Sequence, residues 1–407
     1  MEGGSRVFAV VGSWERRAGV LSLRVTQGGL RNGSEYVVSF VLRNNETRQD
    51  SPEVVVRASV RSSAGPAAGE GVGAAMTKPG SDALGVVGGA DPLLVHVPGF
   101  ASKAIGQSNP LASASNRLTL TLVPDCDMAA GSNVTVSGLT GSQTADTDGL
   151  EVSCGDASRF EAAARWRKGE GAVTLEVGGS GLVNGSAYTV CFVLQNNAGN
   201  QTSSSVSIKA SVDSQFGPFD GEGVFEAMTK PGSDTLGVEH GADPLEIHVP
   251  GFDLKAIGQS NPLASASNRL TLTLVPDCDM AAGSNVTVSG LTGSQTAGTE
   301  DLEMVVSEGL GTRARWVQGG GVLTLTVSGD GGLTHGGNYT VSFVLQNNAS
   351  SQQSPSVSVK PTVESSPLEY DGEGVYETMS TPGTSMLGVA VGADPLLVHV
   401  PGFASKA

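Results

Sequence analysis

Eight asparagines of this chain stand in the Asn-x-Ser/Thr pattern that accepts an N-linked glycan. They are Asn32, Asn45, Asn133, Asn184, Asn200, Asn285, Asn338 and Asn348, and none is followed by proline. The alternation of a strand points Asn133 and Thr135 outward and Val134 inward, and other members fall in turns. Because a sugar can project into solvent from such positions, we predict that several carry glycans. The alternative is that a β protein rich in threonine and asparagine forms such triplets by chance.

The four cysteines are placed unevenly along a long internal repeat. Cys126 and Cys278 occupy equivalent positions in two copies of the repeat. Cys154 and Cys191 occur only in the middle copy, and the next copy has valine and serine in their places. Two cysteines that appear together in one copy favour a disulfide, which fits an oxidising compartment. Two independent thiols are the alternative.

Histidine is the residue type that most readily suggests a metal or catalytic site. His96, His248 and His399 recur at equivalent positions on the outward side of one strand. Each copy holds one of them without a clustered partner at the spacing of metal ligands. We therefore interpret them as ordinary exposed strand residues and expect no metal and no cofactor.

Acidic pairs could bind calcium, which prefers several oxygen ligands. The candidates are Asp125 with Asp127, Asp146 with Asp148, and the Asp-Gly-Glu-Gly runs at 220–223 and 371–374. None resembles a dense calcium loop, so solvated turn residues are the favoured interpretation.

Aromatic and nucleophilic residues give no pattern of an active site. Trp14, Trp166 and Trp316 fall at one repeat position, and a single tryptophan per copy indicates core packing rather than a sugar platform. The sequence has no Gly-x-Ser-x-Gly elbow and no repeated set of serine, histidine and acid. We expect no catalytic residues and no enzyme activity.

The elements that carry these residues alternate apolar and polar positions with a period of two. The alternation is clear in Arg117–Val123, Asn133–Ser137, Ala172–Val177, Tyr188–Leu194 and Val206–Val212. Turn residues separate the runs, and no window keeps a helical period. The pattern predicts an all-β protein in which two antiparallel sheets close face to face, as in Ig-like β-sandwiches.

The repeat itself has the length of a domain. Lys103–Ala145 and Lys255–Ala297 are identical, and a motif ending in Val-Pro-Gly-Phe recurs at Phe100, Phe252 and Phe403. The phenylalanine numbers give spacings of 152 and 151 residues, too long for a solenoid unit and typical of a whole domain. The sequence therefore predicts tandem β-sandwich repeats of roughly 150 residues.

The expected domains follow from the phase of this repeat. They are a partial sandwich at 1–90, full sandwiches at 91–242 and 243–393, and the first strand of a further repeat at 394–407. The boundaries are set at the Gly-Ala-Asp-Pro motifs, where proline fixes the backbone before a strand. Two interpretations of the incomplete ends remain open. The chain is a window from a longer periodic polypeptide, which we favour, or one chain donates a strand to the next.

Composition narrows the choice of partners. The net charge is −16 and the pI is near 4.7, without a basic stripe that could displace counterions from nucleic acid. An anionic membrane surface repels such a chain, and no apolar run reaches the ~18 residues of a spanning helix. We expect no nucleic-acid partner and no membrane insertion in this segment.

Several motifs together resemble tandem repeats of very large surface proteins of unicellular algae. They lie at Val97–Phe100, Ile105–Ser108, Asn116–Leu122, Ala129–Thr144, Tyr188–Asn196 and Ala227–Gly232. The resemblance implies an extracellular array of Ig-like or adhesin-like β-sandwiches, and it implies no activity. The first copy departs from the pattern, with arginine at position 43 where later copies have glutamine.

These observations lead to a non-enzymatic expectation. The main hypothesis is a structural extracellular glycoprotein, a repeating component of a cell-surface filament, appendage or layer. Its partners would be N-linked glycans and other copies of the same modules. The alternative is a cell-surface adhesin whose sandwiches bind a glycan or a partner surface.

Overall fold

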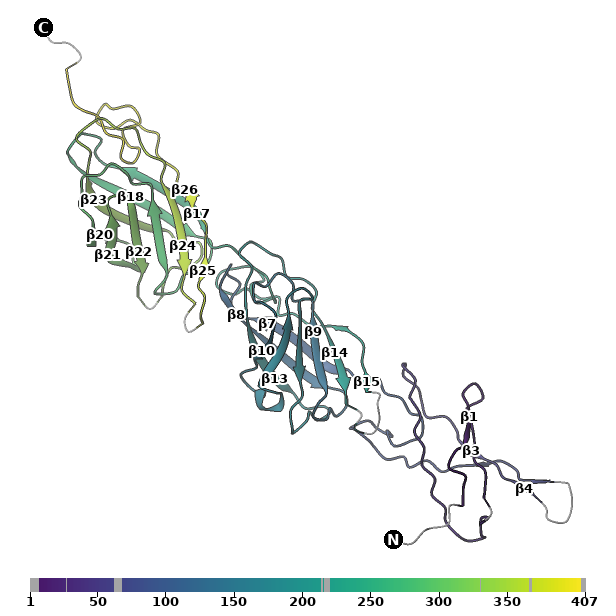
Figure 1. Ribbon diagram of the computed structural model, residues 1–407. Coiled ribbons are helices and arrows are strands. Elements are labelled where there is room, and N and C mark those ends of the chain that lie inside the picture. The colour runs from purple at the N-terminus through teal and green to yellow at the C-terminus, as the bar shows by residue number, and fades with distance from the viewer. Residues whose placement is uncertain are drawn as a thin grey trace. The chain divides into compact units, whose positions relative to one another are not determined.

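The computed structural model describes residues 7–26, 28–61, 68–213, 215, 220–329, 331–365 and 368–403. The chain divides into two compact units, Met1–Asn44 and Asn45–Ala407. Strands make up its regular structure, and the one helical element among the described residues is η1, a 3-10 turn at Ala157–Arg159 (Figure 1). The all-β expectation is confirmed. None of the described helical residues forms a helix long and apolar enough to cross a membrane.

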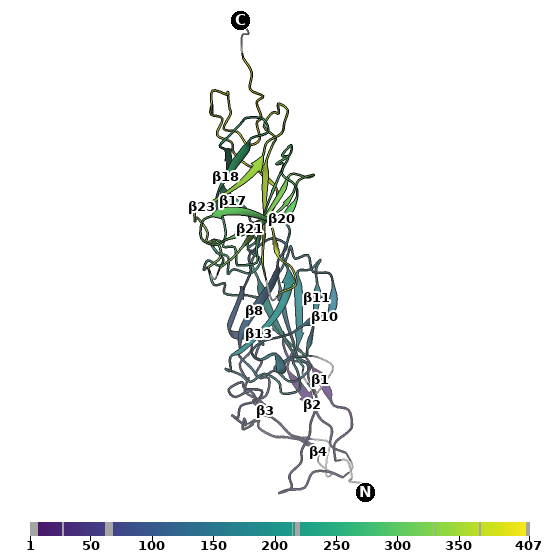
Figure 2. The same cartoon turned by 90° about the vertical axis from the view of Figure 1, so that its left-hand side faces the viewer.

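The first sandwich, as we call residues 100–227, has two antiparallel sheets. One sheet has the order β13-β8-β7, and the other has the order β10-β11-β12-β9-β14-β15, with β16 also paired to β14. In the turned view, β8 and β13 lie on one side and β10 and β11 on the other (Figure 2). The strand bounds are β7 Phe100–Gln107, β8 Ser115–Pro124, β9 Asn133–Ser137, β10 Thr147–Glu151, β11 Ala163–Arg167, β12 Ala172–Glu176, β13 Tyr188–Gln195, β14 Ser207–Val212, β15 Gly221–Glu222 and β16 Glu226–Ala227.

The second sandwich, residues 252–378, repeats this arrangement with one change. Its strands run in the order β17-β18-β23-β20-β21-β22-β19-β24-β25, with β26 paired to β24. The two layers are joined because β20 pairs with both β21 and β23. The bounds are β17 Phe252–Gln259, β18 Ser267–Pro276, β19 Asn285–Ser289, β20 Thr299–Val306, β21 Leu310–Val317, β22 Val322–Val327, β23 Tyr339–Gln346, β24 Ser358–Val363, β25 Gly372–Glu373 and β26 Glu377–Thr378.

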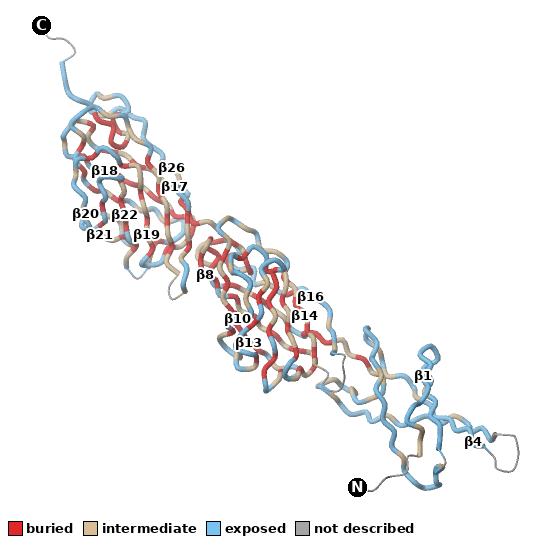
Figure 3. Tube along the Cα trace, viewed as in Figure 1, coloured by how far each residue is buried: buried red, intermediate tan, exposed pale blue. Residues whose placement is uncertain are grey.

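Each sandwich closes over its own apolar core. Leu118, Leu120 and Leu122 alternate along β8 and are all fully buried between the sheets, as the period of two predicts. Trp166 and Trp316 are also buried, and each indole N–H donates to a threonine carbonyl 3.0 Å away. Buried residues fill both sandwiches, whereas the part of the chain N-terminal to the first sandwich is largely exposed (Figure 3).

The N-terminal copy keeps the same pairing registers with fewer strands. In the unit Met1–Asn44, β1 Ser13–Glu15 pairs with β2 Val20–Ser22 and sets Trp14 opposite Leu21. The same tryptophan register recurs as Trp166 opposite Val173. In the other unit, β3 Val55–Val56 pairs with β6 Ala74–Ala75, and β4 Ser59–Arg61 pairs with β5 Ala68–Glu70. Trp14 is 41% exposed, whereas Trp166 and Trp316 are buried.

The junction between the two sandwiches lies a few residues later than the sequence-based boundary at 242/243. Leu245 and Ile247 are buried in the core of the first sandwich, and Ile247 pairs with Gln201. The next core begins with Phe252 on β17. The Gly-Ala-Asp-Pro motif predicts a boundary before Pro244, but the residues after this proline complete the preceding sandwich. Residues 394–407 are expected to begin a further repeat, but Leu396 is buried in the core of the second sandwich and Val398 pairs with Gln352, so this run completes the preceding sandwich. Residues 404–407 lie outside the described residues.

Candidate functional site at the junctions

Each sandwich is preceded by a connecting segment that contains a Leu-Gly turn, and this turn contacts the sandwich that follows it. In the segment before the first sandwich, Leu84 and Gly85 have φ values of 50° and 70°, as a tight hairpin turn requires. The carbonyl of Leu84 accepts the N–H of Asp127 at 2.8 Å. At the next junction, the carbonyl of Leu236 accepts the N–H of Asp279 at 2.9 Å. The same turn therefore docks on the same loop twice.

The glycine of this turn leaves no space for a side chain. A Cβ at Gly85 would lie 2.7 Å from the Cβ of Asn184, and one at Gly237 would lie 2.5 Å from the Cβ of His335. Both distances are far below an ordinary carbon contact. Gly388 occupies the equivalent turn after the second sandwich, and a Cβ there would meet nothing within 4 Å. Close approach at the two docked turns thus depends on glycine.

The loop at 108–115 makes a second set of contacts at the junction between the sandwiches. Leu111 and Ala114 belong to the core of the second sandwich, although they precede β8 of the first. The N–H of Ser115 donates to the carbonyl of Tyr370 at 2.9 Å, and the N–H of Glu373 donates to that of Ala112 at 2.9 Å. Apolar burial and backbone hydrogen bonds therefore both tie the two sandwiches together here.

A buried cluster of side-chain amides holds the connecting segment against the sandwich that precedes it. Asn116 donates to Gln107 at 2.7 Å and to Asn196 at 2.9 Å. Gln107 in turn donates to the carbonyls of Gly241 and Glu246 at 2.9 and 2.8 Å. The cluster is repeated in the second sandwich by Gln259, Asn268 and Asn347. Buried amides are stable only when their polar atoms are paired, as they are in this cluster.

A cluster of histidine, aspartate and cysteine occurs before the first sandwich, and its histidine–aspartate pair recurs before the second; the sequence reasoning missed both. Nε2 of His96 lies 3.1 Å from a carboxylate oxygen of Asp125, and one ligand atom each from His96, Asp125 and Cys126 lie within 4.8 Å of one another. His248 lies 3.2 Å from Asp277 in the same way. Our interpretation of these histidines as ordinary exposed residues is wrong for both, since their side chains are only 18% and 30% exposed.

The environment of these groups decides their protonation. Burial, followed by the charges of Asp125 and Asp127, raises the pKa of the Cys126 thiol to about 12. Burial also raises the pKa of Cys278. Burial acts to raise the pKa of Asp277, but the imidazole of His248 and the N–H of Gly251 outweigh it and leave that pKa below its usual value. A protonated, buried thiol is a poor nucleophile, so these clusters do not favour cysteine-based catalysis.

Cys154 and Cys191 lie together in the structure. Their sulfur atoms are 2.04 Å apart and their Cα atoms 5.6 Å apart, so the structure contains a disulfide between these residues. Cys126 and Cys278 are free and buried. The disulfide ties the segment after β10 to β13, where Ser153 also pairs with Cys191.

The predicted glycosylation sites differ in what their side chains contact. Asn32, Asn45, Asn200 and Asn338 are exposed, and Asn133, Asn285 and Asn348 are partly buried. Asn184 is exposed, but its Nδ2 donates to the carbonyl of Gly85 at 2.7 Å. Since a glycan attaches to this nitrogen, sugar on Asn184 would occupy the place where the Leu-Gly turn docks.

The acidic pairs are engaged by nearby donors. Asp125 and Asp127 accept the N–H groups of Gly99 and Asn184, both at 2.8 Å. Asp148 lies 2.6 Å from a guanidinium nitrogen of Arg167, which lowers the pKa of that exposed carboxyl.

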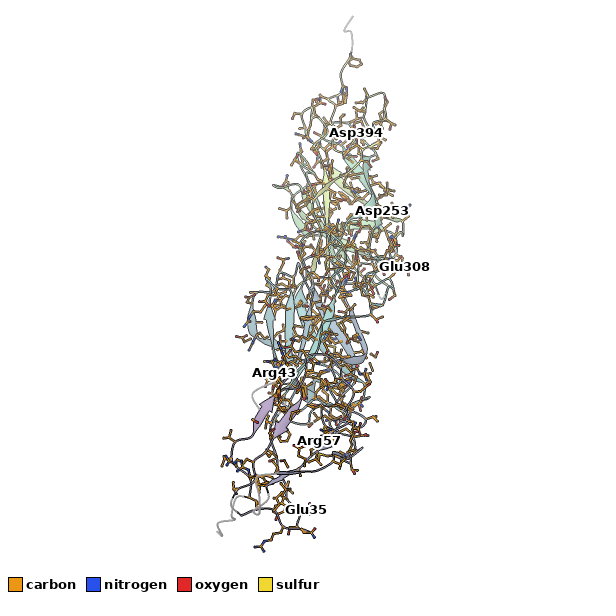
Figure 4. All side chains as sticks on the ribbon, turned by 90° about the vertical axis from the view of Figure 1, so that its right-hand side faces the viewer. Glu35, Arg43, Arg57, Asp253, Glu308 and Asp394 are labelled. Carbon is orange, nitrogen blue, oxygen red and sulfur yellow. A yellow bond between two sulfur atoms is a disulfide. The ribbon has the colours of Figure 1, made fainter. Side chains whose placement is uncertain are left out.

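Charged side chains such as Asp253 and Glu308 lie on the outside of the second sandwich (Figure 4).

Comparisons with known proteins give little help with function. No model of a protein family and no curated protein matches the chain. The C-terminal domain of the antigen I/II-family protein AspA of Streptococcus pyogenes is 8% identical, with 70% of this chain and 100% of that chain covered and a TM-score of 0.33. Collagen adhesin of S. aureus is 10% identical, with coverages of 69% and 90% and a TM-score of 0.20. The serine-rich repeat protein Srr2 of Streptococcus agalactiae is 8% identical, with coverages of 69% and 93% and a TM-score of 0.17. These TM-scores are too low to support a functional assignment.

Proposed function

We propose that this chain is an extracellular cell-surface protein in which β-sandwich modules act as mechanical spacers. The observation that carries the proposal is the repeated docking of the Leu-Gly turn, at Asp127 and again at Asp279. Docked modules keep their spacing, whereas modules on free linkers do not.

An extracellular location is supported by covalent chemistry. The bond between Cys154 and Cys191 belongs to an oxidising compartment. Several Asn-x-Ser/Thr sites, among them Asn200 and Asn338, are exposed and accessible to a glycosyltransferase. Labelling of intact source cells with an antibody to the chain tests this. Surface labelling before permeabilisation supports the location, and labelling only afterwards contradicts it.

The proposal also covers the partners of the chain. The acidic surface, with a net charge of −16, disfavours nucleic acid and anionic membranes. The partners are then N-linked glycans and further copies of the same module in a filament, appendage or layer, in keeping with the resemblance to algal surface-protein repeats. Sedimentation of the purified chain over a range of concentrations tests self-association, and a monomer at every concentration contradicts it.

Stretching single molecules from both ends tests the mechanical role. A spacer should give one force peak for each sandwich. The disulfide shields the segment between Cys154 and Cys191, which are 37 positions apart, from extension. The first sandwich should therefore lengthen by about 120–130 Å less than it does under reducing conditions. Extension without force peaks contradicts the proposal, and equal steps with and without reductant contradict the disulfide.

An adhesive role is the second candidate, and one surface feature favours it. Phe225 lies between β15 and β16, which both pair with β14, and Tyr376 lies at the equivalent position between β25 and β26, which both pair with β24. Their side chains are 53% and 55% exposed. Exposed aromatic residues are enriched where proteins bind partners. The corresponding residue in the N-terminal copy is Gly73.

Binding of the chain to a panel of immobilised glycans tests adhesion. An adhesin is supported if glycan binding is lost in the Phe225→Ala/Tyr376→Ala variant. Binding should be kept in a Val72→Ala control from the N-terminal copy. Absence of any signal, or signal unchanged by the double substitution, removes the support of these aromatic residues.

A further inference from the structure

We propose that His96, Asp125 and Cys126 form a binding site for a divalent metal ion of the zinc type, and that His248, Asp277 and Cys278 form a second one. Each site would join a connecting segment to the sandwich that follows it. The proposal does not depend on the spacer function, because metal binding is measurable whatever the chain does on a cell.

The geometry of the first cluster fits one ion. The three ligand atoms lie within 4.8 Å of one another, and Nε2 of His96 is 3.1 Å from Oδ1 of Asp125. Zinc binds nitrogen and oxygen at ~2.0–2.2 Å, so two ligands on a tetrahedral ion stand about 3.4 Å apart. The imidazole and the carboxylate therefore need to separate by only a few tenths of an ångström, whereas the sulfur of Cys126 would have to lie about 3.6 Å from each of them.

The histidine nitrogens have one polar neighbour each, the carboxylate of the cluster. Nε2 of His96 and Nε2 of His248 are buried from solvent, and their contacts with Asp125 and Asp277, at 3.1 and 3.2 Å, lack the geometry of a regular hydrogen bond. Buried polar atoms are normally satisfied, and an unsatisfied one calls for an explanation such as an ion. The neighbouring carboxylate is held in place by the main chain, since Asp125 and Asp277 each accept a glycine N–H at 2.8 Å.

The second set of residues recurs with the sequence repeat. Nε2 of His248 lies 3.2 Å from Oδ1 of Asp277, and the carboxylate of Asp277 also faces the thiol of Cys278. In both cases the histidine comes from the connecting segment, and the Asp-Cys pair follows the strand β8 or β18 of the next sandwich. The second junction thus repeats the histidine–aspartate pair, and Cys278 adjoins its aspartate.

The ligand set selects the kind of metal. Imidazole nitrogen, carboxylate oxygen and sulfur together suit Zn²⁺, whereas Ca²⁺ and Mg²⁺ require mainly oxygen ligands. On binding, the thiol S–H bond breaks, its proton leaves to solvent and the sulfur bonds to the metal as a thiolate. No electron is transferred, and a water molecule can complete the fourth position.

Titration of the intact, disulfide-bonded chain with Co²⁺ tests the proposal, because a thiolate ligand gives cobalt a characteristic charge-transfer absorption. We expect two Co²⁺ per chain, both displaced by Zn²⁺ and neither by Ca²⁺. The Cys126→Ser variant should bind one ion, and the Cys126→Ser/Cys278→Ser variant should bind none with a thiolate band.

Two further variants keep the test independent of folding defects. His96→Gln leaves the thiol in place and should lose one tight site while its circular dichroism stays unchanged. His399→Ala is the matched control, because no Asp-Cys pair follows it in this sequence, and it should still bind two ions. Absence of a thiolate band in the unaltered chain, displacement by Ca²⁺, or loss of an ion in His399→Ala would overturn the proposal.

Discussion

The two sandwiches differ at one edge, where the chain after β10 meets β13 in the first and the end of β20 meets β23 in the second. In the second sandwich, β20 continues past β21 and pairs with β23, setting Val305 opposite Ser342. In the first, the regular strand β10 stops at Glu151, and a single bridge from Ser153 to Cys191 remains. The disulfide stands where the second sandwich has additional strand pairing.

A local change of backbone accounts for this difference. Cys154 has a φ of 56°, a left-handed conformation that ends the extended path, and η1 follows it. Its counterpart Val306 continues the strand. The two copies are identical through Ala145 and Ala297 and diverge directly before this edge. One covalent bond can therefore replace several backbone hydrogen bonds without changing the sandwich around it.

The largest expected effect tests whether the two cores are equivalent. Trp166→Ala and Trp316→Ala should each destabilise their own sandwich by about 3–5 kcal/mol, because each indole is fully enclosed. Trp14→Ala should cost much less, since Trp14 is 41% exposed. Urea unfolding of the three variants measures this. If only one of the Trp166→Ala and Trp316→Ala variants loses stability, the two cores are not equivalent.

Removal of the disulfide should affect the first sandwich alone. The Cys154→Ser/Cys191→Ser variant should lose about 2–4 kcal/mol, because the unfolded chain regains the freedom of the closed loop. Reductant should produce the same loss in the unaltered chain and none in the second sandwich. If the first sandwich keeps its unfolding midpoint in both tests, the covalent closure does not replace the missing strand pairing.

The buried amide clusters should give smaller and matched effects. Asn116→Ala leaves acceptors of Gln107 and Asn196 without their donor, at a cost of about 1–3 kcal/mol. Asn268→Ala should cost the same in the second sandwich. Hydrogen exchange at the Leu245 amide, which donates to Gln107, should become faster only in Asn116→Ala. Faster exchange there in Asn268→Ala would show that the clusters are not local clamps.

The smallest expected loss of stability distinguishes the docked turn at Gly85 from the one at Gly237. Asn184→Ala removes the bond to the carbonyl of Gly85 and should cost about 0.5–1.5 kcal/mol. His335→Ala at the equivalent position should stay within about 0.5 kcal/mol, because its side chain makes no corresponding hydrogen bond in the described residues. Thermal unfolding of both variants, made without glycosylation, gives the comparison. Equal losses would mean that the Asn184 side chain contributes nothing specific.

Much of the fold could be predicted from the sequence because it depends on local pattern. The alternation in Arg117–Val123 predicted a half-buried strand, and the repeat predicted that Trp166 and Trp316 share one environment. The boundary was misplaced because proline was expected to begin a strand, whereas Pro244 and Leu245 lie in a turn, with Leu245 at a φ of 55°, before the run that contains Ile247. Pairing with Gln201 attaches this run to the preceding sandwich, and no local pattern reveals such a contact.

The junction clusters could not be predicted because their members meet only after folding. His96 lies far from Asp125 in the sequence, and an alternating strand gives no indication of what its outward residues touch. Gln107 and Asn116 are of residue types that are mostly exposed, so composition does not point to a buried cluster. The one usable indication was repetition, because the histidine and the Pro-Asp-Cys-Asp run recur together.

Hydrogen exchange at the Asp279 amide tests the ordered junction most directly, since this amide donates to Leu236 of the docked turn. We predict protection in the unaltered chain and fast exchange in Gly237→Ala, where the new Cβ would collide with His335. Gly388→Ala carries the same backbone strain without a neighbour, so it should leave Asp279 protected. Fast exchange at Asp279 in the unaltered chain, or unchanged protection in Gly237→Ala, would contradict the docked junction.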